Sequence, residues 1–164
     1  MVFERFSGAA HSSCLKETHM FKKILVPTDG SSLATAAATV AAQLAKSQGA
    51  QVVGVYVIDP FPFIGIGDAS AVALQSYMTE ARRAATQALD AVSKVCEAEG
   101  APFVGDTIER NVVHEGVVET AVAEGCDLIV MGSHGRQGVK ALILGSVAQK
   151  VLAHAAVPVL IVKG

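Results

Sequence analysis

The sequence predicts a single α/β domain in which helices cover both faces of a parallel sheet. The chain has 164 residues, a length that suits one domain with a sizeable core. Hydrophobic residues make up 51% of the chain and charged residues 17%, as in globular proteins and unlike disordered ones. From about residue 21 onward, short apolar runs alternate with segments of helical periodicity. This alternation is typical of parallel strands joined by right-handed crossovers.

The first elements are a strand, a helix and a second strand. Residues 23–28 form a short apolar run, and residues 29–32 supply turn and N-cap chemistry. The helix that follows is predicted from apolar residues at helical spacing, namely Leu33, Ala37, Val40 and Leu44. Gly49 is placed to end it. Residues 51–58 are apolar almost throughout, which favours a strand covered on both faces.

The middle of the chain predicts a loop, a long helix and an edge strand. Residues 59–69 contain two prolines and two glycines, so we expect a mobile loop. A helix over about 70–99 is predicted from one apolar stripe: Leu74, Met78, Ala81, Ala85, Ala88, Val92 and Val95. Gly100 closes this helix. Residues 102–108 form a weaker strand, which we expect near an edge of the sheet.

The last elements complete a pattern of five strands and four helices. A third helix is predicted over about 112–124, although Gly116 weakens the helical preference there. Residues 128–131 form the fourth strand, residues 146–154 the fourth helix and residues 157–162 the fifth strand.

Composition also argues against several classes of protein. The formal net charge of −2 argues against nucleic acid as a main partner, because nucleic-acid-binding proteins usually carry a basic face. No apolar run approaches the roughly 18 residues that cross a bilayer. The cysteines Cys14, Cys96 and Cys126 are odd in number and form no C-x-x-C pair. They predict a reducing cytoplasm, with Cys96 and Cys126 as buried thiols.

Residues 1–19 do not share the pattern of the rest. They mix serine, glycine, histidine and charged residues without periodicity, and they contain no extended apolar segment of the kind found in secretory signals. We therefore expect residues 1–19 to be a disordered leader or a non-native extension, and residues 20–164 to form the folded domain.

The most informative motif is the glycine-rich connection between the fourth strand and the fourth helix. Gly132, Gly135 and Gly145 lie in it, and Ser146 opens the helix. Glycines allow close approach of the backbone to a ligand, and amides at a helix N-terminus point at an anion. Ligands bind such sheets at the carboxyl ends of the strands, where the first and fourth strands are natural neighbours and would bring Asp29 beside this turn. The motif therefore predicts a nucleotide site.

Other interpretations of these glycines stay open at this point. The spacing fits neither a P-loop nor a dinucleotide fingerprint, and an ordinary long connection also uses turn glycines. Ser146 and Gln149 fit a capping box, which is a structural reason for the serine. Gly65 and Gly67 faintly resemble a dinucleotide loop, but they do not directly follow a strand, and we interpret them as a decoy.

Four motifs resemble those of the universal stress protein family, and they follow one another along the chain as in the family. The pattern Gly132-x2-Gly135-x9-Gly145-Ser146 is similar to its ATP-binding signature. The other three are similar to its first strand and turn, the end of its second strand, and its last strand: residues 21–32, 56–59 and 157–162. The resemblance runs from about Met20 to the C-terminus.

The resemblance implies a fold, a ligand and a partner. The family's sheet is a five-stranded parallel sheet of order 3-2-1-4-5, similar to the adenine nucleotide alpha hydrolases. The implied ligand is ATP, or ADP or AMP, with Mg²⁺. The implied partner is a second copy, paired antiparallel through Val157 to Val162. A nucleotide-dependent regulator of the stress response, without nucleic-acid or membrane partners, is the expected function.

The resemblance also implies roles for residues. Asp29, with Pro27 and Thr28, would line the pocket, and Asp29 would lie near the ribose or a phosphate-bound metal. Val57 would contact adenine, most simply through its backbone. The remaining roles are the pocket floor and the phosphate cradle: Met131 and Gly132 for the floor, and Gly135, Gly145, Ser146 and Val147 for the cradle.

Charged and titratable side chains near the motif leave alternatives open. Arg136 and Lys140 suit either a phosphate neighbour or a solvated charge, and His134 suits either an exposed loop position or an approach to phosphate. No nucleophile with a matching base is evident in the sequence. The rival functions are a slow ATP hydrolase with Asp29 as its base, and an interaction module that binds no nucleotide.

Overall fold

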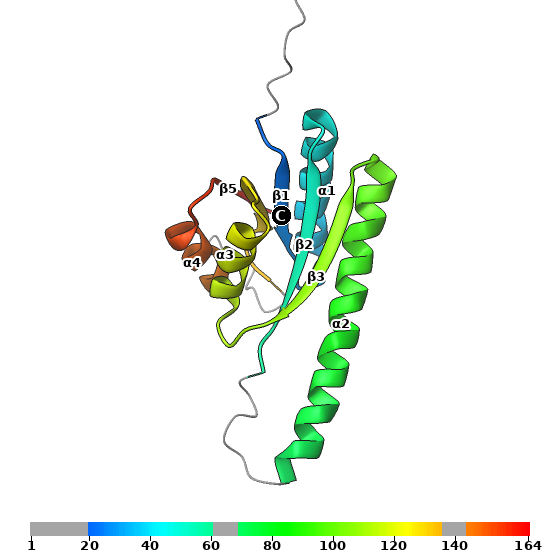
Figure 1. The fold of residues 1–164 in the computed structure, drawn as a ribbon, viewed down its shortest axis with the longest axis vertical. Helices are drawn as coiled ribbons and strands as arrows, with labels where there is room; N and C mark the ends of the chain where they lie inside the picture. The colour runs from blue at the N-terminus through cyan, green and yellow to red at the C-terminus, as the bar shows by residue number, and fades with distance from the viewer. Residues whose placement is uncertain (1–19, 61–68, 136–143) are drawn as a thin grey trace, which may run out of the picture.

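The computed structural model describes residues 20–60, 69–135 and 144–164, which form five strands and four helices in strict alternation. Figure 1 shows their arrangement around a central sheet. Their bounds are β1 Lys23–Pro27, α1 Ser32–Gln48, β2 Gln51–Ile58, α2 Ala69–Glu99, β3 Phe103–Glu109, α3 Val113–Ala123, β4 Leu128–Gly132, α4 Ser146–His154 and β5 Val159–Val162. The loop predicted at 59–69 and the two glycines interpreted as a decoy lie mostly or wholly outside the described residues.

The sheet is parallel throughout, in the order β3-β2-β1-β4-β5. This order confirms the predicted fold class. Ile24 of β1 is level with Leu128 of β4, and Lys23 is level with Gln51 of β2. β2 therefore lies on one side of β1 and β4 on the other, so the strand order reverses between β1 and β4.

Alternating side chains divide the core into two layers. Side chains on one face of β1 and β4 pack with α1 and α2: Ile24, Val26, Leu128 and Val130. Side chains on the other face pack with α3 and α4: Leu25, Ile129 and Met131. Buried strands that alternate between two apolar layers read as continuous apolar runs, which explains why the sequence predicted them well.

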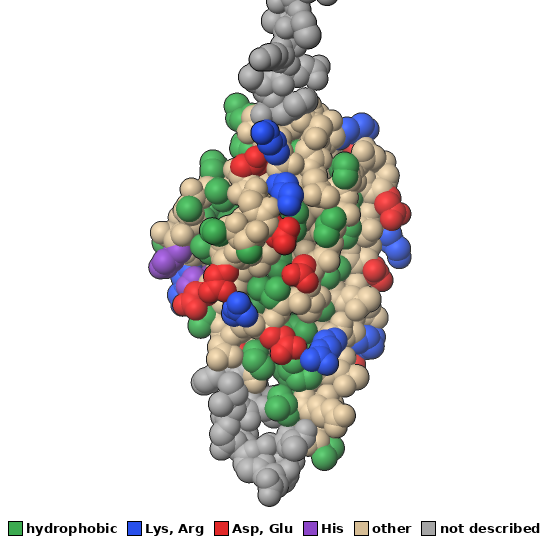
Figure 2. All heavy atoms as spheres, in the orientation of Figure 1, with side chains coloured by type: hydrophobic (Ala, Val, Ile, Leu, Met, Phe, Trp, Pro, Cys, Tyr) green, Lys and Arg blue, Asp and Glu red, His purple; other side chains and the backbone are tan. Residues whose placement is uncertain are grey.

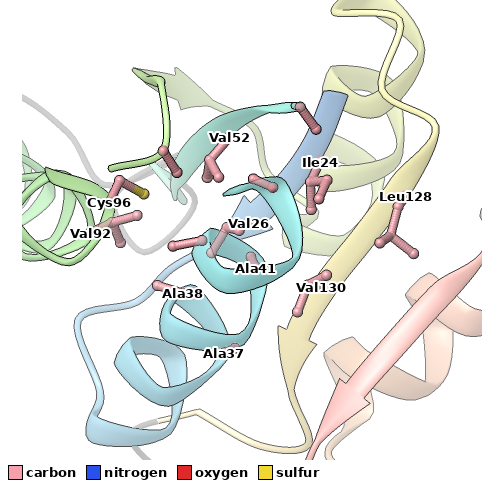
Figure 3. Close-up of a cluster of buried hydrophobic side chains, with 14 residues drawn as sticks. Ile24, Val26, Ala37, Ala38, Ala41, Val52, Val92, Cys96, Leu128 and Val130 are labelled. Carbon is pink, nitrogen blue, oxygen red and sulfur yellow. The ribbon is translucent and has the colours of Figure 1, made fainter. Parts of the chain in front are cut away.

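Alanines bring α1 close to the sheet (Figure 3). The buried residues of this helix are all alanine: Ala34, Ala37, Ala38, Ala41, Ala42 and Ala45. The larger residues from which the helix was predicted, Leu33, Val40 and Leu44, are only partly buried. The helix is confirmed, and small side chains take the positions nearest the strands.

The ends of the elements follow from local chemistry. Ser31 caps α1 by accepting a hydrogen bond from the Ala34 N–H at 3.2 Å. Gly49 ends α1 with a φ of 62°, a left-handed conformation that favours glycine. The fifth strand starts at Val159 and not at residue 157 as predicted, and the preceding Pro158 contributes only its carbonyl oxygen, to Ile129 N–H.

Cys96 and Cys126 are both free and buried, as predicted. Burial raises the pKa of each thiol to about 11, so both stay protonated near neutral pH. No helix among the described residues is both long and apolar enough to span a membrane.

Candidate functional site

The turn after β1 is held by hydrogen bonds within the chain. The Thr28 N–H donates to the carbonyl oxygen of Val55 at 2.9 Å, which ties the end of β1 to β2. Thr28 Oγ1 accepts from the Gly30 N–H at 3.2 Å, and Asp29 Oδ1 accepts from the Ser31 N–H at 3.0 Å. One carboxylate oxygen of Asp29 is thus fixed by the turn, and this orients the other.

The chain after β4 is crossed by the segment that leads into α4. The Ser133 N–H donates to the carbonyl oxygen of Val162 at 2.8 Å, and the Ser133 carbonyl accepts from the Gly145 N–H at 2.8 Å. Ser133 is 6% exposed, and its Oγ lies 3.1 Å from His134 Nδ1. The two ends of the long connection therefore meet at Ser133, close to the carboxyl end of β4.

The turns after β1 and β4 meet at Asp29 and Gly135. A Cβ built on Gly135 would overlap Asp29 Oδ2. The sequence predicted this neighbourhood of a carboxylate and a glycine turn, and the structure brings the two residues together. Since the carboxylate already occupies the space of a side chain at residue 135, only glycine fits there without moving Asp29.

Gly132 and Gly145 have structural reasons of their own. A Cβ on Gly132 would lie 3.0 Å from Leu33 Cγ. A Cβ on Gly145 would lie 3.1 Å from Ser133 O and 3.2 Å from His134 Cα, which are backbone atoms that cannot easily yield. These two glycines therefore let chain segments pack closely against each other, in addition to any approach of a ligand.

The start of α4 differs from the capping box that the sequence predicted. The N-cap is Gly145, which makes no side-chain cap hydrogen bond, and Ser146 is already the first residue of the helix. Gln149 Nε2 donates to the carbonyl oxygen of Leu144 at 2.6 Å, so it does not complete a box with Ser146. The capping-box interpretation is wrong, and Ser146 and Val147 lie exposed at the start of α4, where no side chain within residues 20–60, 69–135 and 144–164 caps the helix.

The other predicted site residues lie around this edge of the sheet or outside the described part. Val57 is half-buried on β2, and its Cγ1 would contact a Cβ on Gly116, so its side chain points toward α3. Met131 is buried under α3 and α4. Pro27 is half-buried at the end of β1. Arg136 lies outside the described residues, as does Lys140.

Two further groups were missed by the reasoning from sequence. Ser133 lies between two predicted residues, and its position inside the glycine motif was the available signal. Tyr77 of α2 donates to the carbonyl oxygen of Asp59 at 2.8 Å and so ties the helix to the end of β2. Burial, with smaller contributions from Asp59 and Tyr56, raises the pKa of the Tyr77 hydroxyl, so this donor keeps its proton.

The described residues around Asp29 offer few ligands for a metal ion. Among the described residues, no cluster of three or more His, Cys, Asp or Glu side chains could hold a metal ion. A single carboxylate such as Asp29 still suits Mg²⁺, which usually keeps waters and takes its remaining ligands from phosphate. A cavity of about 270 Å³ lies elsewhere, between the middle of α2 and the start of β3, lined by Leu89, Phe103 and Gly105 among others.

The chain was compared with known families and proteins. The model of the universal stress protein family matches residues 20–163. Universal stress protein MJ0531 of Methanocaldococcus jannaschii is 37% identical over 145 residues, which cover 88% of this chain and 84% of that protein.

Solved structures agree in fold. The structure of MJ0577 has a TM-score of 0.76 at 30% identity, with 88% of this chain and 97% of that chain covered. Two further structures are a universal stress protein in complex with cAMP and one from Archaeoglobus fulgidus in complex with dAMP. The cAMP complex has a TM-score of 0.62 at 24% identity, with 87% of this chain and 97% of that chain covered. The dAMP complex has a TM-score of 0.61 at 23% identity, with 85% of this chain and 96% of that chain covered. The chain belongs to the universal stress protein family.

Proposed function

We propose that this protein binds ATP, or ADP or AMP, at the carboxyl ends of β1 and β4 and acts as a nucleotide-dependent regulator. The observation that carries the proposal is the start of α4, where no side chain of the described residues caps the first amides, beside the contact between Asp29 and Gly135. The cAMP and dAMP complexes of the two fold relatives support an adenine nucleotide as the ligand.

The phosphates fit the start of α4 on electrostatic grounds. The first amides of a helix have no partner within the helix, and the helix dipole places partial positive charge there. Ser146 and Val147 would offer amides and one hydroxyl to the phosphates, together with the Gly135 amide. The N–H of Gly145 is bonded to the Ser133 carbonyl, so Gly145 would serve the cradle by letting the phosphates approach the backbone closely. The unplaced Arg136 is proposed as a further phosphate neighbour.

Asp29 makes a cation part of the proposal. A carboxylate placed directly against a polyphosphate is repelled unless a cation lies between them. The alternative is that the carboxylate contacts a neutral hydroxyl group of the nucleotide instead of its phosphates. We propose that Asp29 contacts either a phosphate-bound Mg²⁺ or the ribose. Thr28 and Pro27 would form the adjacent wall, Met131 and Gly132 the floor, and the Val57 backbone would contact the adenine.

The nucleotide proposal is tested by calorimetric titration of the purified protein with ATP, with and without Mg²⁺. Asp29→Asn should weaken ATP binding about tenfold or more, whereas the matched control Asp90→Asn, an exposed residue of α2, should leave the affinity unchanged. If Asp29 holds the metal, Mg²⁺ strengthens ATP binding to the wild type and not to Asp29→Asn. If it binds ribose, the variant is weaker under both conditions.

Two results would overturn the proposal. Absence of ATP, ADP and AMP binding by calorimetry, with no adenine nucleotide in the denatured protein by mass spectrometry, would favour an interaction module. Steady phosphate release that is lost in Asp29→Asn would make the protein a hydrolase with Asp29 as its base.

We also propose a homodimer through β5. Since β5 ends the strand order, its outer edge pairs with no other strand among the described residues, and Leu160 on it is 40% exposed. Exposed apolar edges of sheets need covering. Sedimentation should show a dimer for the wild type and a monomer for Leu160→Glu. A wild-type monomer at all concentrations would contradict this part of the proposal.

A further inference from the structure

A pair of histidines lies away from the nucleotide site, where α3 and α4 pack together. His114 belongs to the first turn of α3, and His154 is the last residue of α4. Their ring centroids are 5.5 Å apart and their planes are inclined by 50°. His114 is half-buried and His154 is exposed. Figure 2 shows histidine side chains at the surface over these two helices, where an ion from solvent can reach them.

The separation of the rings matches that of two imidazoles bound to one metal ion. With metal–nitrogen bonds of about 2 Å and a tetrahedral angle, the ring centroids of two ligands lie roughly 5 Å apart. The tilt of 50° is far from face-to-face stacking, so the rings can turn edges toward a shared point.

A second, independent observation concerns the proton on His154. Its Nδ1 lies 2.7 Å from the carbonyl oxygen of Lys150, an acceptor, so in the neutral ring Nδ1 carries the hydrogen and donates. The lone pair is then on Nε2, which is free to bind a metal. Histidine ligands of metals usually donate their other N–H to a carbonyl or carboxylate in this way, which fixes the tautomer and the ring.

The helix ends do not decide the charge of the ligand, since His154 ends α4, where the dipole favours a cation, and His114 begins α3, where it disfavours one. The C-terminus of a helix carries partial negative charge from its last carbonyls. Imidazole ligands suit Zn²⁺, Cu²⁺ and Ni²⁺ and not Mg²⁺, which prefers oxygen. No third His, Cys, Asp or Glu ligand completes a cluster within the part of the chain that the structure describes.

We propose that His114 and His154 form a two-histidine site for a divalent transition metal, with Zn²⁺ as its reference ion and water in the remaining positions. The bound metal links the first turn of α3 to the last residue of α4. Since α4 begins at Ser146, the same helix joins this site to the proposed phosphate site, although neither proposal depends on the other.

The test uses the full-length, nucleotide-free protein and ZnCl₂. Titration calorimetry measures the affinity, and thermal unfolding with and without Zn²⁺ measures the stabilisation that binding to the folded state produces. His114→Gln and His154→Gln should each weaken Zn²⁺ binding by more than the roughly tenfold that loss of an outer-shell partner costs. Each should also abolish the rise in the unfolding midpoint. Circular dichroism checks that both variants are folded, as expected for replacements at partly exposed positions.

His134→Gln is the matched control, because it removes a histidine outside the pair. It should keep the Zn²⁺ affinity and the rise in the midpoint. Since His11 and His19 are also present in the chain, substoichiometric Cu²⁺ is added to the isotope-labelled protein to locate the site. Broadening of backbone amide signals should centre on residues 113–115 and 152–155. Broadening centred elsewhere, or wild-type Zn²⁺ affinity in the double variant His114→Gln/His154→Gln, would overturn the proposal.

Discussion

Two helices start at the same edge of the sheet, and they start in different ways. α1 follows β1 through a turn in which Ser31 Oγ accepts from the Ala34 N–H and Asp29 Oδ1 accepts from the Ser31 N–H. α4 follows β4 through a longer connection and starts at Ser146, after the N-cap Gly145, which makes no side-chain cap hydrogen bond. Both starts lie beside the point where the strand order reverses. In the described part of the chain a side chain caps α1 and none caps α4.

The difference indicates which helix is suited to bind an anion. Amides at a helix start are satisfied by side chains, water or ligands. At α1 a serine accepts from one of these amides. At α4 Gln149 donates to the carbonyl of Leu144, and no side chain among the described residues accepts from the first amides. Under the proposed function, the same position in the topology serves packing at α1 and phosphate binding at α4.

The largest effect is expected from Gly145→Val, which disrupts the close packing of Gly145 on Ser133 and His134 before α4. The new Cβ meets Ser133 O and His134 Cα, both backbone atoms, so the crossing must open. We expect the free energy of unfolding to fall by about 1–3 kcal/mol, as for other overpacked sites, and ATP binding to be lost. Urea unfolding and calorimetry measure the two effects. Wild-type stability would show that the crossing at Ser133 does not form.

Gly135→Ala should affect binding more than stability. The new methyl group meets Oδ2 of the Asp29 carboxylate, a side-chain atom, and no backbone atom. ATP affinity should fall about tenfold, equivalent to about 1.4 kcal/mol. A double-mutant cycle with Asp29→Asn should show effects that are less than additive, because both changes act on one carboxylate. Fully additive effects would mean that Gly135 acts independently of Asp29.

Ser31→Ala sharpens the comparison at the capped helix. Loss of the bond to Ala34 N–H should lower the free energy of unfolding by about 1 kcal/mol, the usual cost of removing a serine N-cap. ATP affinity should stay within about twofold, because Asp29 accepts from the backbone N–H of Ser31, which alanine keeps. Chemical unfolding measures the first effect. A large loss of affinity at unchanged stability would assign the phosphate to α1 instead.

Ser146→Ala is the counterpart at α4 and has the smallest expected effect. Since Ser146 is exposed and is not the cap, stability should stay within about 0.5 kcal/mol, as for ordinary surface substitutions. ATP binding should weaken by about 0.5–1 kcal/mol, the size of one net hydrogen bond. A loss of stability like that of Ser31→Ala would restore the capping role that the structure denies.

The fold could be predicted because local signals agreed with the tertiary structure. The buried strands read as apolar runs, Ser31 preceded a helical pattern, and Gly49 stood where the chain takes a φ of 62°. The buried face of α1 could not be predicted from hydrophobicity alone. Its alanines lie nearest the sheet and are buried, whereas its larger residues are only partly buried. Closeness of packing decides this choice, and it is a property of the tertiary structure.

The candidate site was predicted in part. The neighbourhood of Asp29 and Gly135 followed from topology, since both residues come after central parallel strands. The burial of Ser133 and the absence of a capping box at Ser146 did not follow, because both result from the crossing of the chain before α4 over the end of β4. Contacts between segments that are joined by a long connection leave no periodic signal in the sequence.

The most direct test is to map phosphate contacts by backbone amide NMR of the ¹⁵N-labelled protein, with adenosine and with ATP plus Mg²⁺. Signals that move with ATP but not with adenosine report on the phosphates. We predict that these are the amides of Gly135, Ser146 and Val147, while those of Ser32 to Ala34 at the capped helix stay in place. Phosphate-dependent shifts confined to α1, or to the cavity between α2 and β3, would contradict the account.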